Sequence, residues 1–112
     1  MSNFFPVTKL YRAVGVEEYF SIKRTGKFSL HNLGVDVKYF GLNFEETLKF
    51  ADMLFNVEVV AIISVEIDAA KLQNLADFTH IDTYLFKSGT AIITAANLPC
   101  FNSAIKNIKH EL

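Results

Sequence analysis

With 112 residues and no linker-like stretch, the chain is predicted to form one domain over residues 1–112, large enough for a single hydrophobic core. Its hydrophobic fraction of 51% and its 11 Phe exclude a disordered chain and favour a compact, aromatic-rich interior. The formal net charge of -1 argues against general binding to nucleic acid or to an anionic membrane, which needs clustered Lys and Arg.

The sequence also bears on the compartment. Cys100 is the only cysteine, so the chain can form no intrachain disulfide and contains no CxxC metal pair. Residues 1–12 lack the basic start and the apolar core of a signal peptide. The longest apolar run, residues 57–67, is too short and too interrupted by polar residues to span a bilayer. We therefore expect a cytoplasmic protein, with secretion by a dedicated bacterial machine as the open alternative.

The first third of the chain predicts a strand, a helix and a second strand. Residues 9–14 (KLYRAV) are typical of a short strand that carries Leu10 and Arg12 on one face. Residues 16–26 (VEEYFSIKRTG) predict a helix with acids in its first turn, bases in its last turn and Gly26 just after its end. A polar, glycine-containing segment crosses to the second strand, residues 37–42 (VKYFGL).

Residues 43–55 (NFEETLKFADMLF) give the strongest local pattern. Asn43 is a plausible N-cap, and Glu46 three residues later completes a capping-box pattern. The apolar side chains that follow line one helix face; they are Phe44, Leu48, Ala51, Leu54 and Phe55.

The second half of the chain predicts three strands and two helices. The expected strands are residues 57–67, 80–86 and 89–96, the first apolar enough for the centre of a sheet. Asp68 is expected to cap a short helix over residues 69–75, and Asn97 a final helix over residues 98–108. The predicted fold is therefore α+β: a mixed β-sheet with about four flanking helices.

The histidines and the cysteine, which could in principle bind a metal or react, are well explained by structural roles. His31, His80 and His110 show no ligand-like spacing, so we expect structural or solvent roles for them and no metal site. Cys100 lies on the apparent inward side of the last helix, which predicts a buried, inert thiol. No phosphate-binding loop, dinucleotide glycine pattern, nucleophile elbow or HExxH motif is present.

Arg12 is the exception. A guanidinium among strand residues is costly to bury unless it meets a carboxylate, a set of carbonyls or a phosphate-bearing ligand. The residue pattern alone favours a structural salt bridge and leaves a ligand-binding role open.

Several segments in order favour the second role. They are LYRAV, a helix containing EEY, TGKF, KYFGLNFEETLKFA and VVAIISVEI. This arrangement resembles the mono-ADP-ribosyltransferase fold, in particular the small toxin-type domains at the ends of bacterial polymorphic toxins. The resemblance implies that an Arg on the first strand grips the phosphate and ribose side of NAD. It also implies a Ser/Thr-rich motif between the second strand and its helix, and a Glu on a later strand that orients the nicotinamide ribose.

The resemblance assigns these roles to individual residues of this sequence. Arg12 matches the first-strand Arg, and Asn43 stands where the motif usually has a hydroxyl residue. Tyr39 or Phe40 would pack on nicotinamide, although either is equally well explained as core. The late strand, SGTAIITAANLP, has no acidic residue where the usual catalytic glutamate would stand. Glu66, on an earlier strand, is the remaining candidate for the catalytic carboxylate.

Two interpretations of different classes follow. In the first, the domain takes NAD and transfers ADP-ribose to a macromolecular acceptor. In the second, it is a non-catalytic interaction, immunity or regulatory module that binds a protein partner. The retained Arg12 favours the first interpretation, and the missing late glutamate favours the second.

Overall fold

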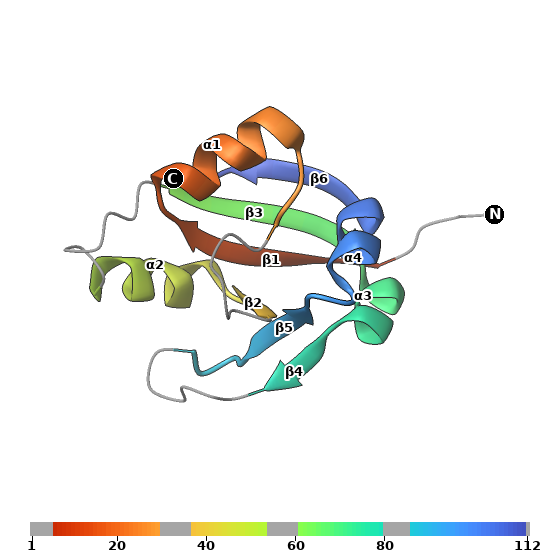
Figure 1. The fold of residues 1–112 in the computed structure, drawn as a ribbon. Helices are drawn as coiled ribbons and strands as arrows, with labels where there is room; N and C mark the ends of the chain where they lie inside the picture. The colour runs from red at the N-terminus through yellow and green to blue at the C-terminus, as the bar shows by residue number, and fades with distance from the viewer. Residues whose placement is uncertain (1–5, 30–36, 54–60, 80–85, 112) are drawn as a thin grey trace.

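The computed structural model describes residues 6–29, 37–53, 61–79 and 86–111. Over these residues the structure is α+β, with a six-stranded sheet flanked by four helices (Figure 1). The elements in chain order are β1 Val7–Val14, α1 Val16–Thr25, β2 Val37–Gly41, α2 Phe44–Met53, β3 Ala61–Asp68, α3 Ala69–Leu75, β4 Asp77–Thr79, β5 Thr90–Thr94, α4 Leu98–Ala104 and β6 Ile105–His110.

The strands lie in the order β4-β5-β2-β1-β3-β6, and each neighbouring pair that the structure describes is antiparallel. The expectation of a mixed sheet is therefore wrong for these strands. A parallel pair needs a connection that returns the chain to the end where the first strand began. Here the connections leave the next strand running the opposite way.

The pairing on the two sides of β1 differs greatly in extent. Against β3, β1 is in register over its whole length, from Val7 opposite Asp68 to Val14 opposite Ala61. Against β2, the register consists of Tyr11 opposite Gly41 alone. The two strands therefore separate beyond this point, which leaves room between them for a pocket.

The core lies on one face of the sheet, under α1, α3 and α4. Its buried side chains include Leu10 and Val14 of β1, Ile63, Val65 and Ile67 of β3, Ile22, Leu72 and Leu98. Phe28, Phe40 and Phe101 form an aromatic group within it, with ring centroids 5.1–6.3 Å apart. Because alternate residues of a strand share a face, Arg12 lies in the same row as Leu10 and Val14.

The end of the chain differs from the sequence prediction. Helix α4 ends at Ala104, and Ile105–His110 form edge strand β6 instead of continuing the helix to residue 108. The spacing of Ile105 and Ile108 suggested a helical stripe. In the structure the register shifts between Glu66 and Ile67, so that Ile105 lies opposite Ile67 and Ile108 opposite Val65. This bulge puts two residues three apart on the same sheet face.

Cys100 also departs from expectation, because its side chain is exposed. The buried residues of α4 are Leu98 and Phe101. Cys100 directly precedes Phe101 and therefore points about 100° away from it around the helix axis.

Other expectations fall partly outside the described residues. The expected strand 80–86 lies there except for its last residue, as do Leu54, Phe55, His31 and His80. In the part of the chain that the structure describes, no helix is long and apolar enough to cross a membrane.

Phe101 is the side chain on which the aromatic group depends. We expect Phe101→Ala to lower the free energy of unfolding by about 3–5 kcal/mol, because it leaves a cavity between Phe28 and Phe40. Phe20→Ala is the matched control, since the Phe20 side chain is 58% exposed and should cost far less. Urea unfolding monitored by circular dichroism measures both values. Equal losses in the two variants would contradict this account of the core.

Candidate functional site

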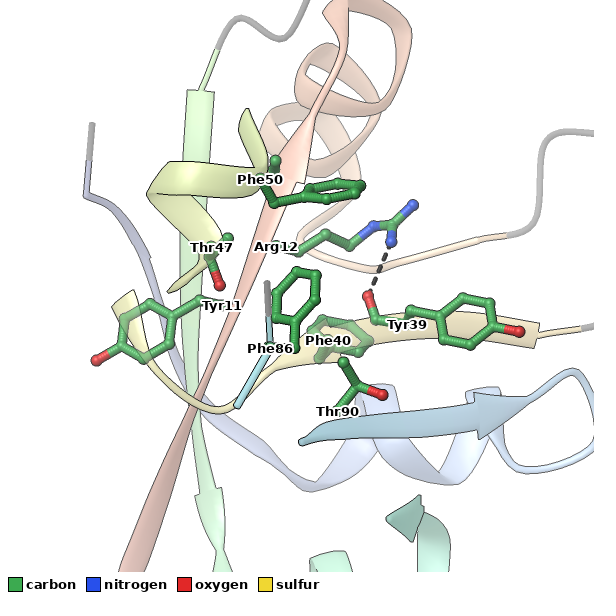
Figure 2. A pocket seen from close by; sticks show the side chains of 10 residues that line it. Tyr11, Arg12, Tyr39, Phe40, Thr47, Phe50, Phe86 and Thr90 are labelled. Carbon is green, nitrogen blue, oxygen red and sulfur yellow. Dashed lines mark hydrogen bonds between the residues drawn. The ribbon is translucent and has the colours of Figure 1, made fainter. Parts of the chain in front are cut away.

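A pocket of about 480 Å³ opens where β1 and β2 separate (Figure 2). Five of the ten described residues that line it are aromatic, and the others include one arginine and two threonines. The described residues that line it are Tyr11, Arg12 and Ala13 of β1, Tyr39, Phe40 and Gly41 of β2, Thr47 and Phe50 of α2, and Phe86 and Thr90.

Gly41 allows α2 to approach the end of β2. A Cβ atom at this position would collide with Thr47 Oγ1 and would lie 3.1 Å from Phe86 Cε1. The absence of a side chain at residue 41 therefore brings two walls of the pocket together.

The turn that leads into α2 positions the side of the pocket formed by Phe50 and Phe86. The Asn43 side chain accepts a hydrogen bond from the Glu46 backbone N–H at 3.0 Å, which confirms the predicted N-cap. In a capping box the Glu46 carboxylate would accept a hydrogen bond from the backbone N–H of Asn43. Here the Glu46 carboxylate has a different partner. It accepts hydrogen bonds from Ser88 Oγ at 2.8 Å and from the Ser88 backbone N–H at 3.1 Å. This link holds the turn that carries Phe86, whose ring centroid lies 5.3 Å from that of Phe50.

Arg12 makes the principal polar contacts beside the pocket. Its Nε and Nη2 donate to the two carboxylate oxygens of Glu18 at 2.6 and 3.0 Å, which is a bidentate ion pair between β1 and the first turn of α1. Its Nη1 donates to the Tyr39 carbonyl at 2.9 Å, as the dashed line in Figure 2 marks. The guanidinium carbon lies 6.0 Å from the centroid of the Phe40 ring. The salt-bridge partner expected for Arg12 is therefore Glu18.

Lys38 adds a second cation. Its side chain is only 4% exposed, and its Nζ lies 3.2 Å from Glu18 Oε2. Burial, together with the Arg12 charge, lowers the pKa of Lys38 below its usual 10.5, and Glu18 offsets part of this effect. Burial raises the pKa of Glu18. The hydrogen bonds and charges of Arg12 and Lys38 outweigh that effect, so the pKa of Glu18 lies below its usual 4.5.

The predicted nicotinamide-packing residues lie on opposite sides of β2. Phe40 is 1% exposed and packs into the core, with one part of its ring against the pocket. The Tyr39 ring points away from Phe50 and Phe86 and is 45% exposed, so that the Tyr39 carbonyl is the part that meets Arg12. Asn43 lies at the start of α2, where it caps the helix, and does not appear among the described lining residues.

Glu66 is not brought together with Arg12. Opposed residues of an antiparallel pair share a face, so Glu66 opposite Lys9 lies on one face of the sheet and Arg12 opposite Ile63 on the other. Asn107 Nδ2 donates to Glu66 Oε1 at 3.5 Å. Strand β3, which carries Glu66, also lies on the far side of β1 from the pocket strand β2.

Sequence reasoning missed several residues around the site. In the sequence Glu18 stands out only as one of two acids in the first turn of a helix, and Lys38 matches no motif. The signal for Lys38 was its position two residues before Phe40, which places both on the buried face of one strand. Thr47, Phe50, Phe86 and Thr90 carry no sequence signal for a pocket, because they come from two segments far apart in the sequence, α2 and residues 86–90.

Within residues 6–29, 37–53, 61–79 and 86–111, no three His, Cys, Asp or Glu side chains are grouped so that they could hold a metal ion. His110 packs edge-on against Tyr19, with ring centroids 5.3 Å apart.

No protein-family model matches the sequence, and neither the curated proteins nor the solved structures include a significant match to the chain.

The depressed pKa of Glu18 makes stability depend on acid pH. The Glu18 contribution is complete above about pH 4.5 and is lost as the pH falls through the lowered folded-state value. We expect Glu18→Gln to cost about 2 kcal/mol of unfolding free energy at pH 7, and the gap from wild type to shrink in acid. Chemical unfolding at several pH values measures it. Glu17→Gln, at an exposed position of the same turn, is the control, and a gap that is constant with pH would contradict the pairing.

The close approach at Gly41 gives a further prediction. Gly41→Ala should destabilise the fold by about 1–3 kcal/mol, because the new methyl group collides with Thr47 Oγ1. The double variant Gly41→Ala/Thr47→Ala should lose less than the sum of the two single losses, since the colliding hydroxyl is gone. A double-mutant cycle from thermal unfolding tests this, and strict additivity would show that the two residues are not in contact.

Proposed function

We propose that the pocket binds NAD, and that the chain is an ADP-ribosyltransferase-like domain in which NAD binding is the function best supported. One observation carries the proposal: Arg12, projecting from β1, lies beside an aromatic pocket that β2 and the capped helix α2 complete. Two of the segments that carry the family resemblance, LYRAV and KYFGLNFEETLKFA, thus meet at one site.

Arg12 has donors for a phosphate group. A guanidinium carries five N–H groups, and three of those of Arg12 donate to described residues. The planar fork of the arginine guanidinium is well suited to the phosphate oxygens of NAD. The hydrogen bond from Nη1 to the Tyr39 carbonyl lies at an exposed position, where a ligand can reach it.

The aromatic walls suit the flat rings of NAD. Ligand sites commonly enclose about 300–1,000 Å³ and combine apolar walls with a few polar groups, and the pocket of about 480 Å³ is of this kind. Phe50 and Phe86 would pack against one ring, and Thr47 and Thr90 would supply hydroxyl groups. The exposed Tyr39 ring would cover the part of the ligand outside the pocket.

Transfer of ADP-ribose requires a catalytic carboxylate in addition to NAD binding. Breaking the nicotinamide–ribose bond develops positive charge on the ribose, which a carboxylate must stabilise. None of the described residues that line the pocket is acidic, and Thr90 is what the late strand β5 contributes. Glu66 shares a sheet face with Tyr11 and Ala13 of the pocket, but it lies opposite Lys9 on β3. A catalytic role for Glu66 would therefore require the reacting groups to extend across β1.

The second candidate is a non-catalytic module that binds a protein partner. The absence of an acid among the described lining residues favours it, and so do exposed apolar side chains on α1. Val16 is 45% exposed and Phe20 58%. Such side chains are common at protein interfaces, where aromatic residues are enriched.

Calorimetric titration with NAD tests the proposed function. We expect wild type to bind NAD, and Arg12→Lys to bind at least about tenfold more weakly, because lysine keeps the charge but lacks the fork. Arg24→Lys, at an exposed position of α1, makes the same exchange away from the pocket and should bind as wild type does. The proposal would be sunk by the absence of heat at millimolar NAD, or by equal affinities of wild type and Arg12→Lys.

Incubation with labelled NAD and a cell lysate then separates the two candidates. A labelled macromolecule that appears with wild type and is lost with Glu66→Gln would support transfer through that carboxylate. NAD binding without any labelled product would leave the non-catalytic module.

A further inference from the structure

The charged group formed by Arg12, Glu18 and Lys38 contains two cations and one carboxylate. Glu18 Oε2 lies 2.6 Å from Arg12 Nε and 3.2 Å from Lys38 Nζ, so a single oxygen serves both cations. Among the described residues, no second carboxylate pairs with either cation. The group therefore carries an excess positive charge.

The excess positive charge is costly because two of the three side chains are largely buried. The Lys38 side chain is 4% exposed and that of Glu18 is 13% exposed. A buried charge without a counter-ion is costly, and the lowered pKa of Lys38 has the same physical origin. A further anion beside Arg12 would balance the group.

Glu18 is positioned to make way for such an anion. Its two oxygens occupy Nε and Nη2 of Arg12, which is the edge of a guanidinium that a phosphate or a ligand carboxylate also binds in bidentate fashion. If Glu18 leaves this edge, it is not left unpaired, because Lys38 already lies within ion-pair distance.

We propose that Glu18 is an exchangeable counter-ion: an anionic group of the ligand, phosphate or carboxylate, takes its place on Arg12 while Lys38 retains Glu18. Glu18 then lowers the affinity of the site for anions by competing with them, and Lys38 raises it by holding Glu18 aside. Neither residue is among the described residues that line the pocket. The inference rests on the proposed function in its choice of Arg12 as the anion-binding residue, and it does not require the ligand to be NAD.

A purely structural ion pair would behave differently. Loss of either Glu18 or Lys38 would then change stability and leave anion affinity unaltered, or would reduce affinity in both variants as the site loosened. Exchange predicts changes of opposite sign, which stability effects alone cannot produce. It also predicts that the hydrogen bond from Arg12 Nε to Glu18 breaks when the anion binds, which the charges of Glu18 and Lys38 alone would not cause.

The test is calorimetric titration of the full chain with inorganic pyrophosphate. We expect Glu18→Gln to bind about tenfold more tightly than wild type and Lys38→Met about tenfold more weakly. Glu17→Gln removes the same charge from an exposed position of the same helical turn and should stay within about twofold of wild type. Malonate is titrated in parallel, and the same pattern with malonate instead would support exchange with a carboxylate ligand.

A second measurement uses the wild type alone, so it holds even if Glu18→Gln fails to fold. The Nε–H signal of Arg12 in nitrogen-edited NMR reports on its hydrogen bond to Glu18. We expect this signal to shift when pyrophosphate or malonate saturates the site. A signal that stays in place at saturation would overturn the inference.

The outcomes distinguish this inference from the proposed function. If NAD fails to bind, but pyrophosphate or malonate gives changes of opposite sign in the two variants and shifts the Arg12 Nε–H signal, the inference stands and NAD binding is wrong. If NAD binds through Arg12 but both variants shift in the same direction, or neither shifts, the inference is wrong and NAD binding stands. Failure of both pyrophosphate and malonate to bind wild type and Glu18→Gln overturns the exchange.

Discussion

The bidentate ion pair between Arg12 and Glu18 is the contact on which the surrounding structure depends. Arg12 stands in a row with Leu10 and Val14, and a guanidinium in such a row is tolerated only when its donors are paired. Glu18 meets this requirement from α1, and the Tyr39 carbonyl meets it from β2. One side chain of β1 therefore fixes the position of the following helix and of the neighbouring strand at the same time.

The pocket depends less on this ion pair than on the gap between β1 and β2 and on the hydrogen bonds at the start of α2. Strands β1 and β2 separate after Tyr11 and Gly41, and the missing side chain of Gly41 admits α2. The cap at Asn43 sets where that helix begins, and Glu46 joins it to the turn that carries Phe86. Polar contacts at the edge of the site thus hold aromatic walls in place, while the ion pair of Arg12 supplies charge at one side.

The sequence predicted those features that local interactions determine. Helix α1 ends at Gly26 with a left-handed φ of 70°, and Asn43 caps α2, because these signals lie within a few neighbouring residues. Strand β6 was missed because a bulge in its pairing with β3 imitates helical spacing. The partners Arg12 and Glu18 lie in two different elements, and the three segments of the pocket wall are far apart in sequence. No periodicity connects such residues, so only the folded chain reveals them.

The single register pair between β1 and β2 has a mechanical consequence. The sheet consists of two halves of three strands each, β4-β5-β2 and β1-β3-β6. The pair Tyr11 and Gly41 joins the two halves, and we call this junction the seam. Elsewhere in the sheet, widening a gap between strands would break a row of backbone hydrogen bonds. At the seam it would break few, so the two halves of the sheet can move apart there at little cost in main-chain pairing. The weakest line of the sheet and the mouth of the pocket are thus the same place.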